Sequence, residues 1–280
     1  MLGRFTPWSG NPVLRPSGDG WQSTNVYNPA AVVLEDRVVL LYRAHAADRV
    51  SRIGLASSDD GLHFEAEAWP VLEPTEAYES QGCEDPRLTS IDGTHYLTYT
   101  GFDGASALLC LATSSDLRTW IKHGPLFPEL DTWQTLAWAR ERRAWRPWNK
   151  AGGILPVPIG DRWHMYLGEG AIYHATSPDL LHWTVGSAPV VEGRPGTWDA
   201  DLVEVGAPPV LVEDRVVLLV NGARITSIDD MVVDYRCGRV AFSANDPAQL
   251  VGRDDEPFLQ PTTPLERRGL VPNVTFVERL

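Results

Sequence analysis

The segment GCEDPRLT places an aspartate, Asp85, between another carboxylate and an arginine. A close carboxylate such as Glu84 raises the pKa of an aspartate, whereas an arginine such as Arg87 lowers it. Opposed influences of this kind suit a general acid, which gives a proton to a departing group. The same residues could instead form an Asp–Arg ion pair that holds a strand end. The residues alone leave both interpretations open.

Two glutamates are candidates for a second catalytic group. Glu169 lies between two glycines in YLGEGAIY, where the backbone could approach a ligand closely, and Glu204 lies in DLVEVGAPP at the start of another strand. Glu169 could also be a surface loop carboxylate, and Glu204 could pair with a nearby cation. Three cations, Arg43, Arg52 and Lys150, could bind hydroxyls, phosphate or carboxylates, or could simply neutralise the acidic side chains.

A repeated pattern indicates the elements that must position these residues. The pattern reads Ala, Ser or Thr, Ser, any residue, Asp, Leu or Gly, and then an aromatic residue three positions further on; its copies cover 56–64, 112–120 and 175–183, with a degenerate copy at 241–247. A predicted β-hairpin with an acidic or glycine-containing turn precedes each copy. Each repeat therefore predicts about four antiparallel strands, the unit of a β-propeller. The repeated Asp60, Asp116 and Asp179 are predicted to cap backbone N–H groups in turns.

Four repeats are visible, and the two chain ends, FTPWSGNPVL and VPNVTFVERL, could supply a fifth. We therefore predict an all-β, five-bladed β-propeller that occupies residues 1–280 as a single domain. The first strands of the blades would line a channel, and their starts align Asn28, Asp85, Gly152 and Gly206, so the candidate site lies at that axis. The Trp- and Arg-rich residues 127–149 are predicted to form an insertion, either closing over the leaving group or making an oligomer contact.

Composition excludes several functions. The net charge of -13 argues against binding to nucleic acid or to an anionic membrane surface. No apolar run approaches the roughly 18 residues of a membrane span, and no signal-peptide pattern opens the chain. Three cysteines fit no disulfide framework or metal motif, which favours free thiols and a cytoplasmic location. No histidine shows ligand spacing, so we expect neither a metal nor another cofactor.

The chain resembles glycoside hydrolase family 130, the β-mannoside phosphorylases and β-mannosidases. The matching segments run nearly end to end and include SRIGLASSDDGLHF, the EDPR motif, WNKAGGI, ATSPDLLHW and VPNVTF. The resemblance implies a five-bladed propeller, inversion at the anomeric carbon, a mannoside or oligosaccharide substrate, and Asp85 as the general acid, acting directly or through a sugar hydroxyl. The predicted substrate-binding residues are Asn28, Arg43, Arg52, Glu84, Arg87, Tyr99, Lys150, Asn221 and Asp234.

The resemblance also bears on whether phosphate or water attacks the sugar. The resemblance implies that phosphorylases of this family hold phosphate with a histidine in a motif that reads Val220-Asn221-Gly222 here. It also implies an arginine near the end of the third hairpin, where this chain reads Leu167-Gly168-Glu169. A carboxylate in place of a cation repels phosphate but could activate water. We therefore predict an inverting β-mannosidase, acting on β-1,2 linkages, in which Glu169 or Glu204 is the base and stands about 6.5–9.5 Å from Asp85. A phosphorylase that releases mannose 1-phosphate and a non-catalytic sugar-binding propeller are the alternatives, and a homo-oligomer is possible.

Overall fold

The computed structural model describes residues 6–135, 146–227 and 232–279. The chain folds into two compact units. The N-terminal unit holds residues 6–128 together with Arg279, and the C-terminal unit holds residues 129–278. The single domain expected over residues 1–280 stays a prediction. None of the helices in the described ranges is long and apolar enough to span a bilayer.

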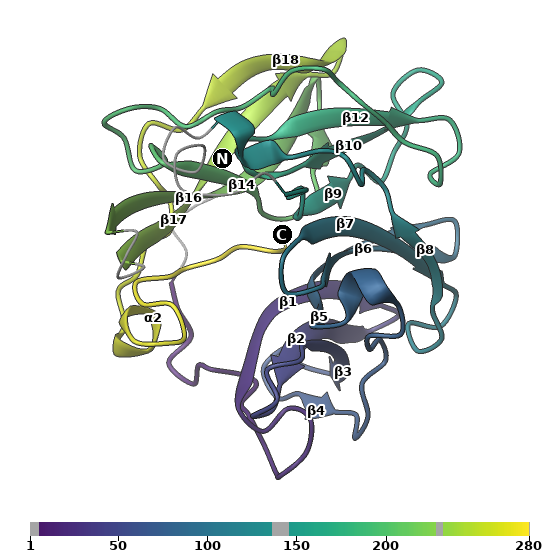
Figure 1. Cartoon of the computed structure of the whole chain (residues 1–280), viewed down its shortest axis with the longest axis vertical. Coiled ribbons are helices and arrows are strands. Elements are labelled where there is room, and N and C mark those ends of the chain that lie inside the picture. Colours follow the sequence, from purple (N-terminus) through teal and green to yellow (C-terminus); the bar gives the residue numbers. More distant parts are fainter. Residues whose placement is uncertain (1–5, 136–145, 228–231, 280) are drawn as a thin grey trace. The chain divides into compact units, whose positions relative to one another are not determined.

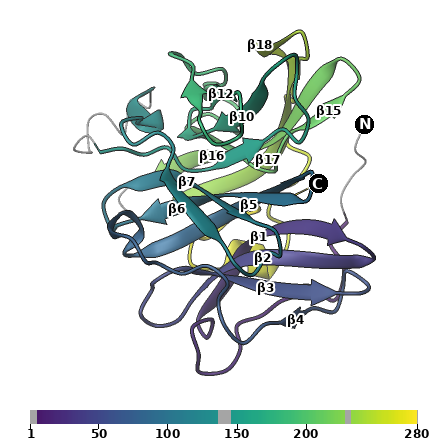
Figure 2. The same cartoon turned by 90° about the vertical axis from the view of Figure 1, so that its right-hand side faces the viewer.

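The N-terminal unit consists of two four-stranded antiparallel sheets whose strands pair in chain order, and β1 of the first sheet lies beside β5 of the second (Figures 1 and 2). Apolar side chains such as Leu41, Ile53 and Leu97 form one core from both sheets. The elements are β1 (Asn25–Leu34), β2 (Arg37–His45), β3 (Arg52–Ser58), β4 (Glu65–Ala66), the 3-10 helix η1 (Ala77–Glu79), β5 (Gly82–Ile91), β6 (Thr94–Phe102), β7 (Ala107–Ser114) and β8 (Ile121–Pro125).

The C-terminal unit also contains two sheets. One has the order β13-β12-β10-β9, and the other has the order β11-β14-β16-β17-β18, with β15 paired to β16. Its core includes Tyr166 stacked on Phe242 at 4.4 Å between ring centroids. The elements are η2 (Thr132–Thr135), β9 (Gly152–Ile154), β10 (Trp163–Leu167), β11 (Glu169–Gly170), β12 (Tyr173–Ser177), β13 (Thr184–Val185), β14 (Leu202–Val205), β15 (Val210–Val212), β16 (Arg215–Ser227), β17 (Val232–Ser243), β18 (Asp246–Arg253) and α2 (Pro264–Arg267).

The all-β prediction is confirmed, but the described residues form four blade-like sheets rather than the expected five. The C-terminal segment does not build a fifth sheet. It joins the large sheet of the C-terminal unit, where Val274 bridges Tyr235 of β17. Part of the N-terminal segment expected to complete a fifth blade, Phe5, lies outside the described residues. The segment VPNVTF thus extends an existing sheet. The Tyr235 N–H donates to the Asn273 carbonyl at 2.9 Å, and the Thr275 N–H donates to the Tyr235 carbonyl at 3.4 Å.

The repeated Ser-x-Asp pattern closes a turn in three sheets, as predicted. In the first copy the Asp60 carboxylate accepts from the main-chain N–H groups of Leu62 and His63, both at 2.8 Å. Asp116 and Asp179 make the equivalent pairs of bonds. Backbone hydrogen bonds from Thr119 and Arg118 lower the pKa of Asp116 to about 2. These aspartates are structural turn residues.

Two first strands carry an irregularity where chemistry was expected. The β1–β2 register shifts between Tyr27 and Pro29, and the β5–β6 register shifts between Glu84 and Arg87. Asn28 and Asp85, inside these shifts, have φ values of 49° and 48°, in the left-handed region that Asn and Asp tolerate best. Ala151, directly before β9, is also left-handed, with a φ of 62°. The alignment of Gly152 and Gly206 with Asn28 and Asp85 stays a prediction. These strand starts are built to turn a side chain out of the regular pleat.

Candidate active site

Asp85 lies at the bulge of β5 and is almost completely buried, with 2% of its surface exposed. Its carboxylate accepts a hydrogen bond from Nη1 of Arg43 on β2, at 2.8 Å. Its main-chain carbonyl accepts a bond from Nη1 of the buried Arg87, at 3.1 Å. An ion pair of Asp85 with an arginine, as considered from the sequence, therefore forms, and it includes Arg43 from the adjacent sheet. Arg87 supports the main chain of the bulge.

Arg43 joins three elements of the N-terminal unit. Its guanidinium donates to Glu84 at 2.5 Å and to the Ser51 hydroxyl at 2.9 Å, besides its bond to Asp85. It also lies over the Tyr27 ring, 4.7 Å from the centroid. Burial lowers the pKa of Arg43, but the charges of Asp85 and Glu84 outweigh it and leave the pKa raised, so this cation stays charged. We call Tyr27, Arg43, Ser51, Glu84 and Asp85 the acid cluster.

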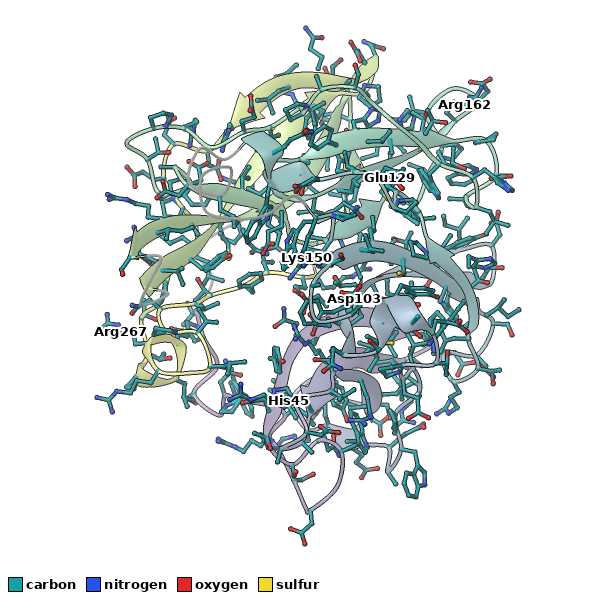
Figure 3. All side chains as sticks on the ribbon, viewed as in Figure 1. His45, Asp103, Glu129, Lys150, Arg162 and Arg267 are labelled. Atoms are coloured by element: carbon teal, nitrogen blue, oxygen red, sulfur yellow. The ribbon has the colours of Figure 1, made fainter. Side chains whose placement is uncertain are left out.

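A close approach of two strand starts assembles the acid cluster. Ser51 forms a parallel bridge with Gly82, and its hydroxyl donates to Glu84 at 3.0 Å. A Cβ atom on Gly82 would lie 2.8 Å from the Ser51 Cβ and 3.1 Å from a Glu84 carboxylate oxygen. Only glycine therefore allows this spacing. His45, labelled in Figure 3, ends β2 and meets the Tyr27 ring edge-on at 5.9 Å.

Glu169, a candidate base, is a buried carboxylate of the C-terminal unit, and 7% of its surface is exposed. Its Oε2 atom accepts from the indole N–H groups of Trp133, at 3.1 Å, and Trp148, at 2.6 Å. The ammonium of Lys150, labelled in Figure 3, lies 3.9 Å from Oε1. Two neutral donors and one cation thus stabilise the negative charge of this buried carboxylate.

A transverse row of polar residues crosses the large sheet. Glu169 on β11 is directly opposite Glu204 on β14, and Glu204 is directly opposite Asn221 on β16. Directly opposed residues of antiparallel strands lie on the same face, about 5 Å apart. The sheet register therefore brings together three residues that the sequence predicted for the site. Glu204 is 1% exposed and Asn221 is fully buried.

The Asn221 amide is engaged by the end of the chain. Its Oδ1 accepts from the Val277 N–H at 2.9 Å, and its Nδ2 donates to the Val277 carbonyl at 3.4 Å. The amide therefore serves as an anchor for the C-terminal segment. Its predicted contact with substrate stays a prediction.

The glycine before Glu169 has a conformational role. Gly168 has a φ of 122°, and a Cβ atom there would lie 2.1 Å from the Ala171 carbonyl oxygen. The sequence suggested that this glycine allows a ligand to approach. The structure shows instead that it permits the turn that carries Glu169 from β10 into β11.

Three further predicted residues have other partners. The Tyr99 hydroxyl donates to the buried Glu79 at 2.8 Å, within the core of the N-terminal unit. Arg52 bonds Asp48 at 3.1 Å and the Val50 carbonyl at 2.9 Å. Asp234 pairs with Arg236 at 2.7 Å. These placements favour structural roles, most clearly for Tyr99, which is completely buried. Among the described residues no group of three or more His, Cys, Asp or Glu side chains is arranged to hold a metal ion.

Comparison with known proteins identifies the family. A family profile described as β-1,4-mannooligosaccharide phosphorylase, that of glycoside hydrolase family 130, matches residues 7–280. The chain belongs to glycoside hydrolase family 130. The resemblance noted from the EDPR motif and its companion segments is therefore confirmed.

Two curated relatives in family 130 come from a Thermoanaerobacter species. A 1,2-β-oligomannan phosphorylase is 32% identical, over 96% of this chain and 86% of the relative. A β-1,2-mannobiose phosphorylase is 30% identical, over 98% of this chain and 88% of the relative. These names support phosphorolysis, the alternative drawn from the sequence, better than hydrolysis.

Solved structures of the family share the fold. A protein of Parabacteroides distasonis assigned as a glycoside hydrolase superposes with a TM-score of 0.87 at 30% identity, covering 100% of this chain and 90% of that protein. A second, described with family 130 glycoside hydrolases that target β-1,2-mannosidic linkages in Candida mannan, gives 0.85 at 31% identity, covering 99% and 87%. Family 130 thus includes both reactions among proteins similar to this chain.

Sequence reasoning missed four residues of this family 130 protein, two that contact Arg43 of the acid cluster and two that bond Glu169. Ser51 and Tyr27 contact Arg43, and Trp133 and Trp148 bond Glu169. The signal for the tryptophans was present, since both lie in the insertion rich in Trp and Arg. No periodicity pointed to them, because the bonds join positions 36 and 21 residues apart.

Proposed function

We propose that this family 130 chain cleaves β-1,2-linked mannosides. The observation that carries the proposal is the buried Asp85 carboxylate, held on a left-handed bulge by Arg43 and Arg87. Backbone strain at a buried ionisable group is typical of a functional site, because an ordinary strand gains nothing from it. The names of the two curated relatives support the β-1,2 linkage.

In the proposed reaction Asp85 gives its proton to the departing glycosidic oxygen. Inversion then requires a second reactant on the opposite face of the sugar, either a water activated by a carboxylate or a phosphate ion. Glu169 and Glu204 are the candidate bases for water. The separation of either glutamate from Asp85 stays a prediction.

The residues of the C-terminal unit favour water. The resemblance implies an arginine of the family's phosphorylases near the position of Glu169, and Glu204 is directly opposite Glu169 in the sheet. Two buried carboxylates side by side repel a phosphate dianion, whereas either could accept a proton from water. The Asn221 amide, at the position of the phosphate-binding histidine, is bonded to Val277. We therefore propose hydrolysis as the reaction that this chain's own site supports.

Phosphorolysis is the second candidate, and the names of the relatives favour it. Lys150 is the cation that could hold phosphate, since its ammonium lies at the edge of the Glu169 carboxylate. Of the other two cations considered from the sequence, Arg43 is already bound to two carboxylates and a hydroxyl, and Arg52 is bonded to Asp48. One cation beside two carboxylates is a weak phosphate site compared with a cluster of basic groups.

A product assay tests the proposal. The protein is incubated with β-1,2-mannobiose, β-1,2-mannotriose and β-1,4-mannobiose, each with and without phosphate, and the products are separated by anion-exchange chromatography. Hydrolysis predicts mannose at the same rate in both conditions, with the α-anomer appearing first by NMR. Mannose 1-phosphate formed only with phosphate would establish phosphorolysis instead. Sugar binding without any product would support a non-catalytic propeller and contradict the proposal. A cytoplasmic location and a homo-oligomeric state remain predictions.

A further inference from the structure

The two flanks of the predicted insertion are joined at its base. Asp131 and Trp148 form a parallel bridge, the Thr132 N–H donates to the Trp148 carbonyl at 2.7 Å, and the Trp148 N–H donates to the Leu130 carbonyl at 3.2 Å. The Asn149 side chain adds a bond to the Leu130 carbonyl at 2.8 Å. Main-chain hydrogen bonds therefore join the two ends of the insertion. The middle of the insertion, 136–145, lies outside the described residues.

The base of the insertion presents two indole rings to Glu169. The Trp133 and Trp148 rings pack against each other at 4.8 Å between centroids, with 43° between their planes. Both indole N–H groups donate to the same oxygen, Oε2 of Glu169. The Thr132 hydroxyl donates to the Glu169 main-chain carbonyl at 2.7 Å. The carboxylate and the main chain of this residue are therefore both held by one short segment.

The arrangement makes the two carboxylate oxygens unequal. A carboxylate oxygen has two lone-pair directions, and two N–H donors fill those of Oε2. Among the described residues Oε1 accepts no hydrogen bond. The Lys150 ammonium lies 3.9 Å from it, and Glu204 is directly opposite Glu169 in the sheet. Oε1 is thus the oxygen that retains the capacity to accept a proton.

We propose that Trp133 and Trp148 are positioning residues that fix Glu169 as the base, with Oε1 as its proton-accepting atom. This inference rests on the proposed hydrolysis. In the step, a water proton passes to Oε1 and the water oxygen forms a bond to the anomeric carbon. The glycosidic C–O bond breaks, and the departing oxygen takes the proton of Asp85. Glu169, rather than Glu204, is then the base, and Trp133 and Trp148 act on a carboxylate of their own unit.

The test removes each indole N–H while keeping an aromatic ring. Trp133→Phe and Trp148→Phe are each expected to lower kcat for β-1,2-mannobiose about tenfold, with KM changed less than about twofold, since a hydrogen bond to a charged group is lost but sugar contacts are not. Trp183→Phe is the matched control. It also removes one indole bond, to the Leu180 carbonyl at 2.9 Å in a blade turn, and should leave kcat unchanged. Thermal unfolding confirms that each variant is folded. If one of the two tryptophan variants does not fold, the other is sufficient for the test.

A double-mutant cycle separates positioning from a general loss of packing. In a Glu169→Ala background Trp148→Phe should cause no further loss of kcat, because the group that it positions is absent. An equal loss in both backgrounds, or full kcat in both tryptophan variants, would overturn the inference while mannose release by the unmodified protein still supports the proposed function. An unmodified protein that releases no mannose from any mannoside would overturn both.

Discussion

At the scale of single residues, Arg43 decides how the acid cluster is held. One guanidinium serves two carboxylates of β5 and the Ser51 hydroxyl, directly before β3. Its planar fork matches several oxygens at once, which the single ammonium of lysine cannot do. Only 17% of its side chain is exposed, so water replaces few of these bonds when they are lost.

We expect Arg43→Lys to lower the free energy of unfolding by about 1–3 kcal/mol and to reduce turnover, because at least one buried carboxylate loses its donor. Urea unfolding measures the first effect. Arg37→Lys is the control, since Arg37 pairs with Asp59 at the surface, where both side chains are more than half exposed. It should change stability by less than about 0.5 kcal/mol. Similar small effects for both substitutions would contradict the role given to Arg43.

The sequence predicted the residue types of the site better than their partners. Asp85, Glu169 and Glu204 stood out because charged side chains interrupted predicted strands. The partner of Asp85 was not predictable from its neighbours, since Arg43 lies 42 residues earlier in the chain. The adjacent Arg87 was the natural candidate, and its guanidinium donates to the main-chain carbonyl of Asp85. Such pairings depend on how separate sheets come together, which local pattern does not encode.

At the scale of elements, the turn before β11 places Glu169. Gly168→Ala should lower the free energy of unfolding by about 2–4 kcal/mol and reduce activity, since the new Cβ would collide with the Ala171 carbonyl. Gly160→Ala is the control. Gly160 also has a left-handed φ, 63°, but no heavy atom lies within 4 Å of its Cβ position, so the expected loss is about 1 kcal/mol. Equal losses in the two variants would show that no collision occurs.

A pair of stacked histidines links β10 and β12 and makes stability depend on pH. Nδ1 of His164 and Nε2 of His174 are 2.9 Å apart, and the rings stack at 5.1 Å. Burial, together with the neighbouring His164, lowers the pKa of His174 from 6.5 to about 4, although the charge of Asp246 opposes this. Between these values the unfolded chain binds more protons than the folded one. The stabilising effect is therefore complete above about pH 6.5 and is lost as the pH falls toward 4.

We expect the free energy of unfolding to fall by up to about 3 kcal/mol as the pH falls from 6.5 to 4, because the folded chain disfavours protonation of His174. Urea unfolding at a series of pH values measures the slope. His174→Gln should flatten the slope in this range, because glutamine does not titrate. A slope that is unchanged in the variant would exclude His174 as its source.

Local repeats made the sheets themselves predictable. The Ser-x-Asp turns and the hairpins before them follow short-range rules, and three turns form as expected. The bulges of β1 and β5 were not predicted, although Asn28-Pro29 and Asp85-Pro86 mark both of them. A proline cannot donate to the sheet, so each pair indicates where regular pairing is interrupted.

At the scale of the whole molecule, the number of sheets was the main error. Four visible repeats and a fifth blade assembled from the two chain ends predicted five blades, whereas the described residues form four sheets and the C-terminal segment joins the largest one. Chain length and repeat spacing cannot distinguish a short segment that adds to an existing sheet from one that starts a new sheet. The choice depends on long-range bonds such as those between Asn221 and Val277.

The Asn221 anchor predicts how firmly the end of the chain is held. Asn221→Asp keeps the shape of the side chain but replaces its N–H donor by an oxygen facing the Val277 carbonyl, directly opposite Glu204. We expect a loss of about 2–4 kcal/mol in the free energy of unfolding at neutral pH. Asn245→Asp, in an exposed turn, should have little effect. Unchanged thermal stability in the Asn221 variant would show that this anchor is unimportant.

The proposed cleavage of a β-mannoside depends most on Asp85 as the proton donor. The direct measurement is the rate at which Asp85→Asn cleaves β-1,2-mannobiose, compared with the unmodified protein and with Asp59→Asn, an exposed aspartate, as control. The account predicts a loss of about 10²–10⁴-fold for Asp85→Asn and none for the control, with both variants folded. Full turnover by Asp85→Asn would contradict it.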